Sequence, residues 1–175
     1  MKGVSKVVKE RSIIGERDFN KWITDWRRPR KNLDFSLENK HFFLGGPDLD
    51  DFTKLIMNEA QNSILIANPF IEECYLTDIL KENANKQIEI KVVTREPYQD
   101  KKKTECHSNL REKGIDLKLD KRIHSKIIVI DNKVVVVSSM NFYSGSSGGA
   151  SNEAGIVSID EKVVDSAASY IRQFF

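Results

Sequence analysis

Apolar and polar positions recur along the chain with two different periods, and these periods predict its secondary structure. Seven apolar stretches predict β-strands at residues 41–45, 63–71, 87–94, 115–119, 124–131, 133–141 and 153–160. Amphipathic segments predict helices at residues 48–61, 75–86, 98–113 and 161–174. Strand and helix alternate through the first two-thirds of this region, which favours βαβ units. We therefore expect an α/β fold with a mixed, largely parallel β-sheet sandwiched between helices.

The pattern divides the chain into a basic N-terminal extension, residues 1–34, and a globular domain, residues 35–175. Within the extension, Asp18 to Arg28 is expected to form a short helix that ends at Pro29. No apolar run approaches the roughly 20 residues that a membrane-spanning helix needs. Charged residues are scattered through the N-terminal segment, which therefore lacks the apolar block of a secretory signal. We therefore expect a cytoplasmic protein without stable membrane association.

Charge is distributed unevenly between these two units. Residues 1–31 contain ten basic and four acidic residues, so the rest of the chain has an acidic excess. A basic arm on a slightly acidic body is a common way to hold a polyanion by its phosphates, and nucleic acid is the expected partner. The candidate contacts are Arg27, Arg28, Arg30 and Lys31. The alternative is a solvated basic helix with no partner.

The cysteines and histidines do not have the spacing of a metal site. Cys74 and Cys106 are too few for a disulfide framework and lack zinc-site spacing, and His41 and His107 do not improve it. We therefore expect reduced thiols, no metal and no cofactor.

The stretch from 124 to 141 contains the candidate chemistry. His124 and Lys126 share a strand face, because strand side chains alternate with period two. Asp131-Asn132-Lys133 then has the residue types of a tight hairpin turn, and for Asp131 we expect a structural role in this turn.

The length of that turn decides which residues of the second strand join them. A two-residue loop places Ser139 and Asn141 on the face of Lys126, whereas a three-residue loop brings up Ser138 instead. We expect Ser139 and Asn141 to complete the cluster. Glu153, at the start of the next strand, is then placed to accept a hydrogen bond from the far ring nitrogen of His124.

These residue types suit phosphoryl chemistry. An imidazole is a nucleophile near neutral pH, while Lys and Asn stabilise charge that develops on non-bridging phosphate oxygens. Each residue has a structural alternative: Ser139 and Asn141 as strand-end residues that satisfy the backbone, and Glu153 as a solvated strand start. A lysine within an apolar strand, Lys126, is harder to explain without a role because burying an unpaired ammonium is costly.

The spacing resembles the motif of the phospholipase D superfamily. That motif has His-x-Lys, then Asp after four residues, then Gly-Ser-x-Asn after six more. Here His124-Ser125-Lys126, Asp131 and Ser138-Ser139-Met140-Asn141 match every gap, and only Ser138 departs from the usual Gly. Glu153 resembles the acidic residue that follows the motif. The resemblance covers roughly residues 35–175.

The resemblance implies a two-step reaction in which one His attacks phosphorus to give a phosphohistidine and a second His protonates the leaving oxygen. Most members of the family have two copies of the motif. This chain has one, so it resembles the short branch in which two chains pair and each supplies His124, Lys126 and Asn141 to one site without a metal.

The expected function is therefore a metal-independent phosphodiesterase, an endonuclease acting as a homodimer on DNA or RNA. The rival enzyme is a phospholipase D or phosphatidyltransferase with a lipid diester as substrate. The rival from another class is a nucleic-acid-binding module that has lost catalysis, and the fold alone does not decide among the three.

Overall fold

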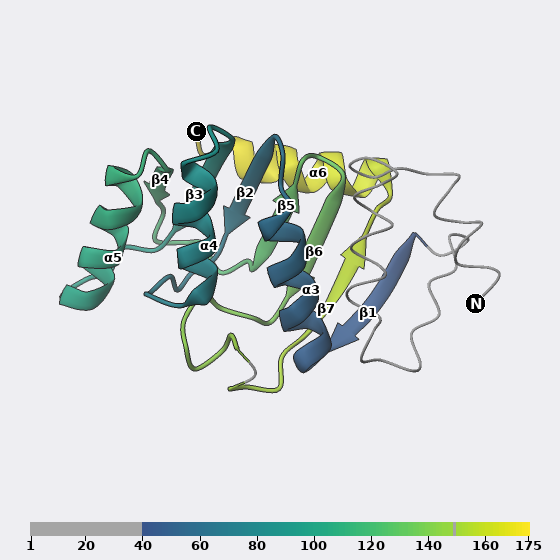
Figure 1. Cartoon of the computed structure of the whole chain (residues 1–175), viewed down its shortest axis with the longest axis horizontal. Coiled ribbons are helices and arrows are strands. Elements are labelled where there is room, and N and C mark those ends of the chain that lie inside the picture. Colours follow the sequence, from purple (N-terminus) through teal and green to yellow (C-terminus); the bar gives the residue numbers. More distant parts are fainter. Residues whose placement is uncertain (1–39, 149) are drawn as a thin grey trace.

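The computed structural model describes residues 40–148 and 150–175, which form one seven-stranded β-sheet with four helices (Figure 1). The strands are β1 (His41–Gly45), β2 (Ser63–Ala67), β3 (Glu89–Thr94), β4 (Asp116–Leu119), β5 (Ile127–Ile130), β6 (Val134–Ser138) and β7 (Ala154–Ser158). The helices are α3 (Pro47–Asn58), α4 (Tyr75–Ala84), α5 (Lys101–Glu112) and α6 (Glu161–Arg172). Each overlaps its predicted segment, so the predicted order of elements is confirmed.

The sheet is mixed, as expected, with the strand order β1-β7-β6-β5-β2-β3-β4. β2, β3 and β4 pair in parallel through α4 and α5, whereas the other neighbours pair antiparallel. Within the described residues, five strands run in one direction, yet four of the six neighbouring pairs are antiparallel. The expectation of a largely parallel sheet is therefore right for strand direction and wrong for strand pairing, because β5 and β7 run against their neighbours.

Helices cover both faces of the sheet, with α3, α4 and α5 on one face and α6 on the other (Figure 1). The middle of the two neighbouring strands β5 and β6 is buried on both sides, whereas Val137 near the end of β6 is exposed. Ile128 and Val136 pack into the larger core beneath α3, α4 and α5. Val129 and Val135 pack with Val164 of α6 in the smaller core. This burial from both sides explains the unbroken apolar runs in the sequence.

A three-residue turn joins β5 to β6. Ile130 pairs with Val134, which leaves Asp131, Asn132 and Lys133 in the turn. Asp131 and Asn132 have φ angles of 53° and 52°, and the Lys133 N–H donates to the Ile130 carbonyl oxygen at 2.9 Å. Two successive residues with positive φ and this hydrogen bond are the features of a type I′ turn, for which Asp and Asn are suited.

The turn sets the register of the hairpin. Lys126 lies opposite Ser138, whose N–H donates to the Lys126 carbonyl oxygen at 3.1 Å. The expected two-residue loop, which would have placed Ser139 and Asn141 on the face of Lys126, is therefore wrong. The three-residue alternative, which brings Ser138 opposite Lys126, is confirmed.

The Asp131 carboxylate explains why the turn has this form. Its side chain is buried and accepts three backbone N–H groups, from Gln61 at 3.0 Å, Asn62 at 2.7 Å and Ser63 at 2.8 Å. The Asp131 N–H donates in return to the Ser63 carbonyl oxygen at 2.9 Å. Hydrogen bonds to an ionised carboxylate are stronger than neutral ones, so Asp131 fastens the α3–β2 connection to the hairpin. This geometry supports the structural role expected for it.

Replacement of Asp131 therefore destabilises the fold. We expect Asp131→Ala to lower the free energy of unfolding by about 2–4 kcal/mol. The backbone donors lose their acceptor, and alanine tolerates positive φ less well than aspartate does. Asp131→Asn keeps one acceptor oxygen and tolerates positive φ, so we expect a loss of about 1–2 kcal/mol. The measurement is urea unfolding at neutral pH.

The control is Asp116→Ala, which removes an aspartate whose side chain is 43% exposed and lies near Lys91 and Lys118. Its effect should stay within about 0.5 kcal/mol. Equal losses for Asp131→Ala and Asp116→Ala would contradict the structural role.

Candidate active site

The predicted site residues lie at one end of the sheet, where the ends of several strands meet. The start of β5, the end of β6 and the start of β7 meet there because these three strands are consecutive antiparallel neighbours. The ends of β2 and β3 reach the same edge, since β2 pairs antiparallel with β5 and parallel with β3. Figure 1 shows the loop that connects β6 to β7 at this end of the sheet.

His124 and Lys126 precede β5 on an extended segment. The His124 side chain is exposed and Lys126 is half-buried. The Lys126 Nζ lies 3.5 Å from the His124 carbonyl oxygen, so the two residues stay close together. Among the described residues, no hydrogen bond engages the His124 ring. Its nitrogens are therefore open to a ligand at this edge.

A hydrogen-bond network joins Asn141, Ser146 and Glu153. The Asn141 N–H donates to Ser146 Oγ at 2.8 Å, and Ser146 Oγ donates to Glu153 Oε1. Ser139 Oγ donates to the other carboxylate oxygen, Glu153 Oε2, and accepts the N–H of Ala154 at 3.1 Å. The bond expected between Glu153 and the His124 ring is not among the contacts of the described residues, where two serine hydroxyls occupy the carboxylate instead.

The network leaves one polar atom without a partner. Asn141 Oδ1 is buried and has no hydrogen bond within the described part of the chain. A buried amide oxygen without a partner costs free energy.

The loop after β6 is fastened at several points. Ser146 and Ser147 donate backbone N–H groups to the Tyr143 carbonyl oxygen at 3.0 Å each. The Gly148 N–H donates to Asp50 Oδ1 at 2.8 Å, and the Tyr75 hydroxyl donates to the same oxygen. Burial and the Asp50 carboxylate raise the pKa of Tyr75, so its phenol remains the donor. The loop is thereby attached to α3 and α4.

Sequence reasoning missed three residues that position the site. Asn68 Nδ2 donates to the Met140 carbonyl oxygen at 3.0 Å, directly before Asn141. Arg95 Nε donates to the Ile123 carbonyl oxygen at 2.6 Å, directly before His124. The buried Ser146 lies in the loop between β6 and β7, which is rich in Gly and Ser. The available signal was position: Asn68 and Arg95 each follow a buried strand at the edge where the motif lies.

One predicted residue, Asp131, lies away from this cluster. Asp131 is at the opposite end of the β5–β6 hairpin, where it acts on the fold. The predicted nucleic-acid contacts Arg27, Arg28, Arg30 and Lys31, and the helix expected at 18–28, lie outside the described residues.

The described residues contain neither a cluster of metal ligands nor a membrane-spanning helix. No three His, Cys, Asp or Glu side chains in this part of the chain are grouped as metal ligands would be. None of its helices has the length and apolar character needed to cross a membrane.

Comparison with known families identifies the class. A family model described as "Cardiolipin synthase, PLD-like domain" matches residues 54–175. The chain therefore belongs to this family of PLD-like domains, in the phospholipase D superfamily of phosphodiesterases. A comparison with curated protein sequences gave no significant match.

Solved structures share the fold. The phospholipase D family member Nuc from Salmonella typhimurium has a TM-score of 0.67 and 18% identity, over 77% of this chain and 93% of that one. NucT from Helicobacter pylori has a TM-score of 0.64 and 17% identity, over 77% and 94%. TrmBL2, an archaeal chromatin protein described as showing a novel mode of DNA binding, has a TM-score of 0.57 and 14% identity, over 91% and 60%. At these identities the likeness shows the fold alone.

Gly155 lies directly beneath the serine that departs from the family motif. Gly155 pairs with Ser138. A Cβ at Gly155 would lie 2.7 Å from the Ser138 Cβ and 2.8 Å from the Val137 carbonyl oxygen. The missing side chain of Gly155 therefore provides the space that Ser138 occupies.

This contact predicts energetic coupling between the two positions. We expect Gly155→Ala to cost about 1–3 kcal/mol of stability by overpacking. In a Ser138→Gly background the cost should fall by about 1 kcal/mol, because one of the two close contacts is relieved. Thermal and urea unfolding of the four proteins in this cycle measure the coupling.

The matched control is Gly45→Ala, where an added Cβ would meet Phe43 at an ordinary 3.5 Å. This change should not couple to Ser138→Gly. Strictly additive costs for Gly155→Ala and Ser138→Gly would disprove the steric relation.

Proposed function

We propose that this protein is a metal-independent phosphodiesterase that cleaves nucleic-acid phosphodiester bonds through a phosphohistidine on His124, at a site shared between two copies of the chain. One observation carries the proposal. At the end of the sheet where β5 begins, the exposed His124 ring lies next to Lys126 in a PLD-like domain, and Asn141 follows the neighbouring strand β6.

The chemistry assigned to these groups balances as a double displacement. An unprotonated ring nitrogen of His124 attacks phosphorus and the P–O bond to the leaving group breaks. The leaving oxygen takes a proton from His124 of the partner subunit. That second ring, now neutral, accepts a proton from water as the water oxygen attacks phosphorus and the P–N bond breaks. Lys126 and the Asn141 amide stabilise the negative charge on the non-bridging oxygens.

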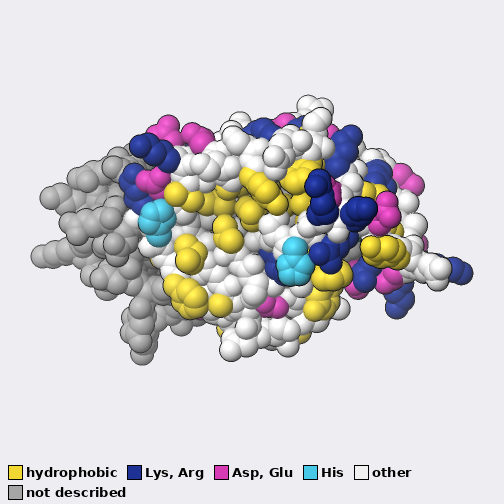
Figure 2. All heavy atoms as spheres, turned by 180° about the vertical axis from the view of Figure 1, so that it is seen from behind, with side chains coloured by type: hydrophobic (Ala, Val, Ile, Leu, Met, Phe, Trp, Pro, Cys, Tyr) yellow, Lys and Arg dark blue, Asp and Glu magenta, His cyan; other side chains and the backbone are white. Residues whose placement is uncertain are grey.

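An exposed apolar row supports pairing of two chains. Phe43, Ile156 and Val137 lie side by side on three adjacent strands, and their side chains are 68%, 53% and 47% exposed. Figure 2 shows this face, where hydrophobic side chains lie beside histidine and basic side chains. Contiguous exposed apolar surface commonly marks a protein interface, and a second copy would bury this row while bringing two β6 strand ends together.

Nucleic acid is the substrate favoured by charge. The basic residues among the first 31 of the chain provide the positive arm that phosphates require. The DNA-binding description of TrmBL2, a protein of the same fold, is consistent with this choice.

A lipid substrate is the second candidate, because the matching family model is described by the name cardiolipin synthase. A phosphatidyl group would use the same histidine chemistry on a different diester. The third candidate, a binding module without catalysis, is disfavoured by the intact set of His124, Lys126, Asn141 and Glu153.

The activity test compares labelled single- and double-stranded DNA and RNA, phosphatidylglycerol vesicles and methyl p-nitrophenyl phosphate, all in excess EDTA. We expect cleavage of polynucleotide and of the small diester, and a loss of at least about a thousandfold in His124→Ala, because the nucleophile is removed. The intermediate should appear as an acid-labile phosphoprotein with a labelled substrate.

The matched control is His41→Ala. His41 is also exposed, but it lies at the start of β1, at the opposite end of the strands from the site. It should retain full activity. Cleavage of vesicles alone would favour the lipid enzyme, and binding of nucleic acid without any cleavage would favour the binding module.

Sharing of the site predicts the behaviour of mixed dimers. A heterodimer of one wild-type and one His124→Ala chain, purified through two different tags, should be as inactive as the His124→Ala homodimer. The reason is that each reaction needs the histidines of both chains. Ile156→Lys should shift the protein to monomer in sedimentation and lose activity, whereas Leu119→Lys, 40% exposed on the far edge strand β4, should do neither. Half activity in the heterodimer would show independent sites.

A further inference from the structure

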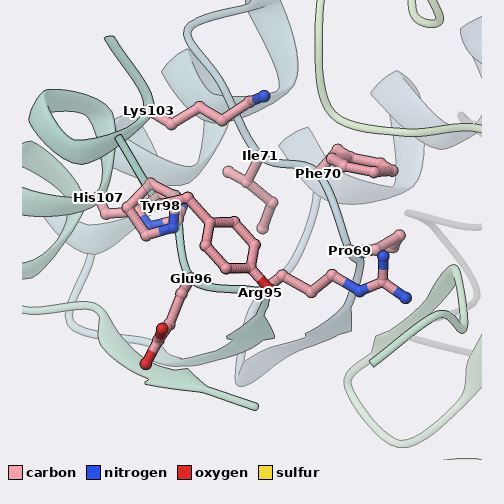
Figure 3. Close-up of a pocket in the computed structure, with 9 residues that line it drawn as sticks. Pro69, Phe70, Ile71, Arg95, Glu96, Tyr98, Lys103 and His107 are labelled. Carbon is pink, nitrogen blue, oxygen red and sulfur yellow. The ribbon is translucent and has the colours of Figure 1, made fainter. Parts of the chain in front are cut away.

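A small hollow lies beside the active site, between the ends of β2 and β3 and the start of α5. Its volume is about 80 Å³. Figure 3 shows the rings of Phe70 and Tyr98 on two sides of it, the cationic side chains of Arg95 and Lys103 on the others, and Ile71 between them. In open α/β sheets this position, beyond the carboxyl ends of parallel strands, is where ligands commonly bind.

Phe70 is a partly exposed aromatic ring with two cationic side chains near it. Its side chain is 38% exposed. The Arg95 Cζ lies 5.9 Å and the Lys103 Nζ 5.6 Å from its ring centroid. Lys103 also forms ion pairs with Glu72 at 3.1 Å and Asp100 at 3.2 Å. Arg95 therefore carries the positive charge that remains available at the rim.

The outer wall of the hollow is equally suited to a flat ligand. Tyr98 is 78% exposed and adopts a positive φ of 49°. Positive φ is uncommon for an aromatic residue, and this conformation leaves the ring outside the core. The Glu96 carboxylate points away from the hollow in Figure 3, so it does not oppose an anionic ligand there.

The back of the hollow contains an unused polar group. His107 is 3% exposed, and neither ring nitrogen has a hydrogen-bond partner within the described residues. Burial lowers the pKa of His107, an effect that the nearby Ile71 backbone opposes only in part. The ring is therefore neutral at pH 7 and forms part of the buried back wall of the hollow.

Direct hydrogen bonds couple the hollow to the catalytic segments. Arg95 Nε binds the carbonyl oxygen before His124 at 2.6 Å. The Phe142 N–H, directly after Asn141, donates to the Phe70 carbonyl oxygen at 3.1 Å. A ligand group in the hollow would thus be fixed relative to the residues that act on phosphorus.

We propose that this hollow is the subsite for a base of single-stranded nucleic acid, next to the phosphate that is cleaved. This inference rests on the proposed function and names its substrate class. The base stacks on Phe70, with Tyr98 on its other side. Arg95 binds the phosphate on the far side of that nucleotide.

The chemistry of the hollow favours a base over the other diester substituents. A quaternary ammonium of a lipid headgroup would also seek aromatic faces, but Arg95 and Lys103 would repel it. A duplex would present its bases already stacked and paired, so that their faces could not reach Phe70.

The test replaces Phe70 by Leu, which keeps the apolar bulk and removes the aromatic face. The substrates are an oligothymidylate, a strand of equal length whose deoxyribose phosphates carry no bases, and methyl p-nitrophenyl phosphate. We expect Phe70→Leu to lower kcat/KM on oligothymidylate by about 5- to 100-fold, mainly through KM, which corresponds to the loss of one stacked base. Activity on the other two substrates should not change, and Phe70→Trp should retain the wild-type preference.

The matched control is Phe175→Leu. Phe175 is 36% exposed and has Lys91 at 5.2 Å from its ring, but it lies at the end of the chain beyond α6. Equal cleavage of oligothymidylate by Phe70→Leu and Phe175→Leu would overturn the subsite. So would wild-type protein that treats the base-free strand like oligothymidylate, or a Phe70 effect confined to phosphatidylcholine vesicles.

Binding measured by fluorescence anisotropy separates the two proposals. If wild type cleaves nothing, including the small diester, the proposed function fails. The subsite is still tested, because Phe70→Leu must then weaken binding of oligothymidylate and leave binding of the base-free strand unchanged. Unchanged binding of both strands would disprove it.

Discussion

The β5–β6 hairpin is buried on both faces, and its two strands pair in one register that fixes the position of the site. In a sheet a slip by one residue turns every side chain to the opposite face. Such a slip would move Val129 out of the core beneath α6 and Ile128 out of the core beneath α3, α4 and α5. The Asp131 carboxylate prevents such a slip at the turn by binding three N–H groups of the α3–β2 connection. A structural aspartate thus determines what happens at the far end of the hairpin.

At that far end, strands that alternate in direction bring together residues distant in sequence. Glu153 holds Ser139 and Ser146, Ser146 holds the backbone of Asn141, and Asn68 holds the residue before it. These contacts position Asn141 through its backbone and do not use its side-chain oxygen, which is buried. Within the described residues the His124 ring has no hydrogen bond, and Arg95 binds the carbonyl oxygen of the residue before it.

The same edge combines two kinds of recognition. The motif residues offer an imidazole, an ammonium and an amide to a phosphate, whereas the neighbouring hollow offers aromatic faces and a guanidinium. Arg95 belongs to both, because its Nε binds the segment before His124 while its Cζ lies over the ring of Phe70. A phosphodiester flanked by a planar group fits this combination better than a phosphate alone.

The sequence determined the order of strands and helices and the family motif, because periodicity and residue spacing are local properties of the chain. It also predicted a shared strand face for His124 and Lys126, whereas the structure places both on the extended segment before β5. It did not determine the loop length between β5 and β6, since both two and three residues suit the same turn composition. It left Asn68, Arg95, Ser146 and Gly155 unassigned. Only the tertiary structure decided these points, because each depends on contacts between segments far apart in the chain, which a single sequence does not record.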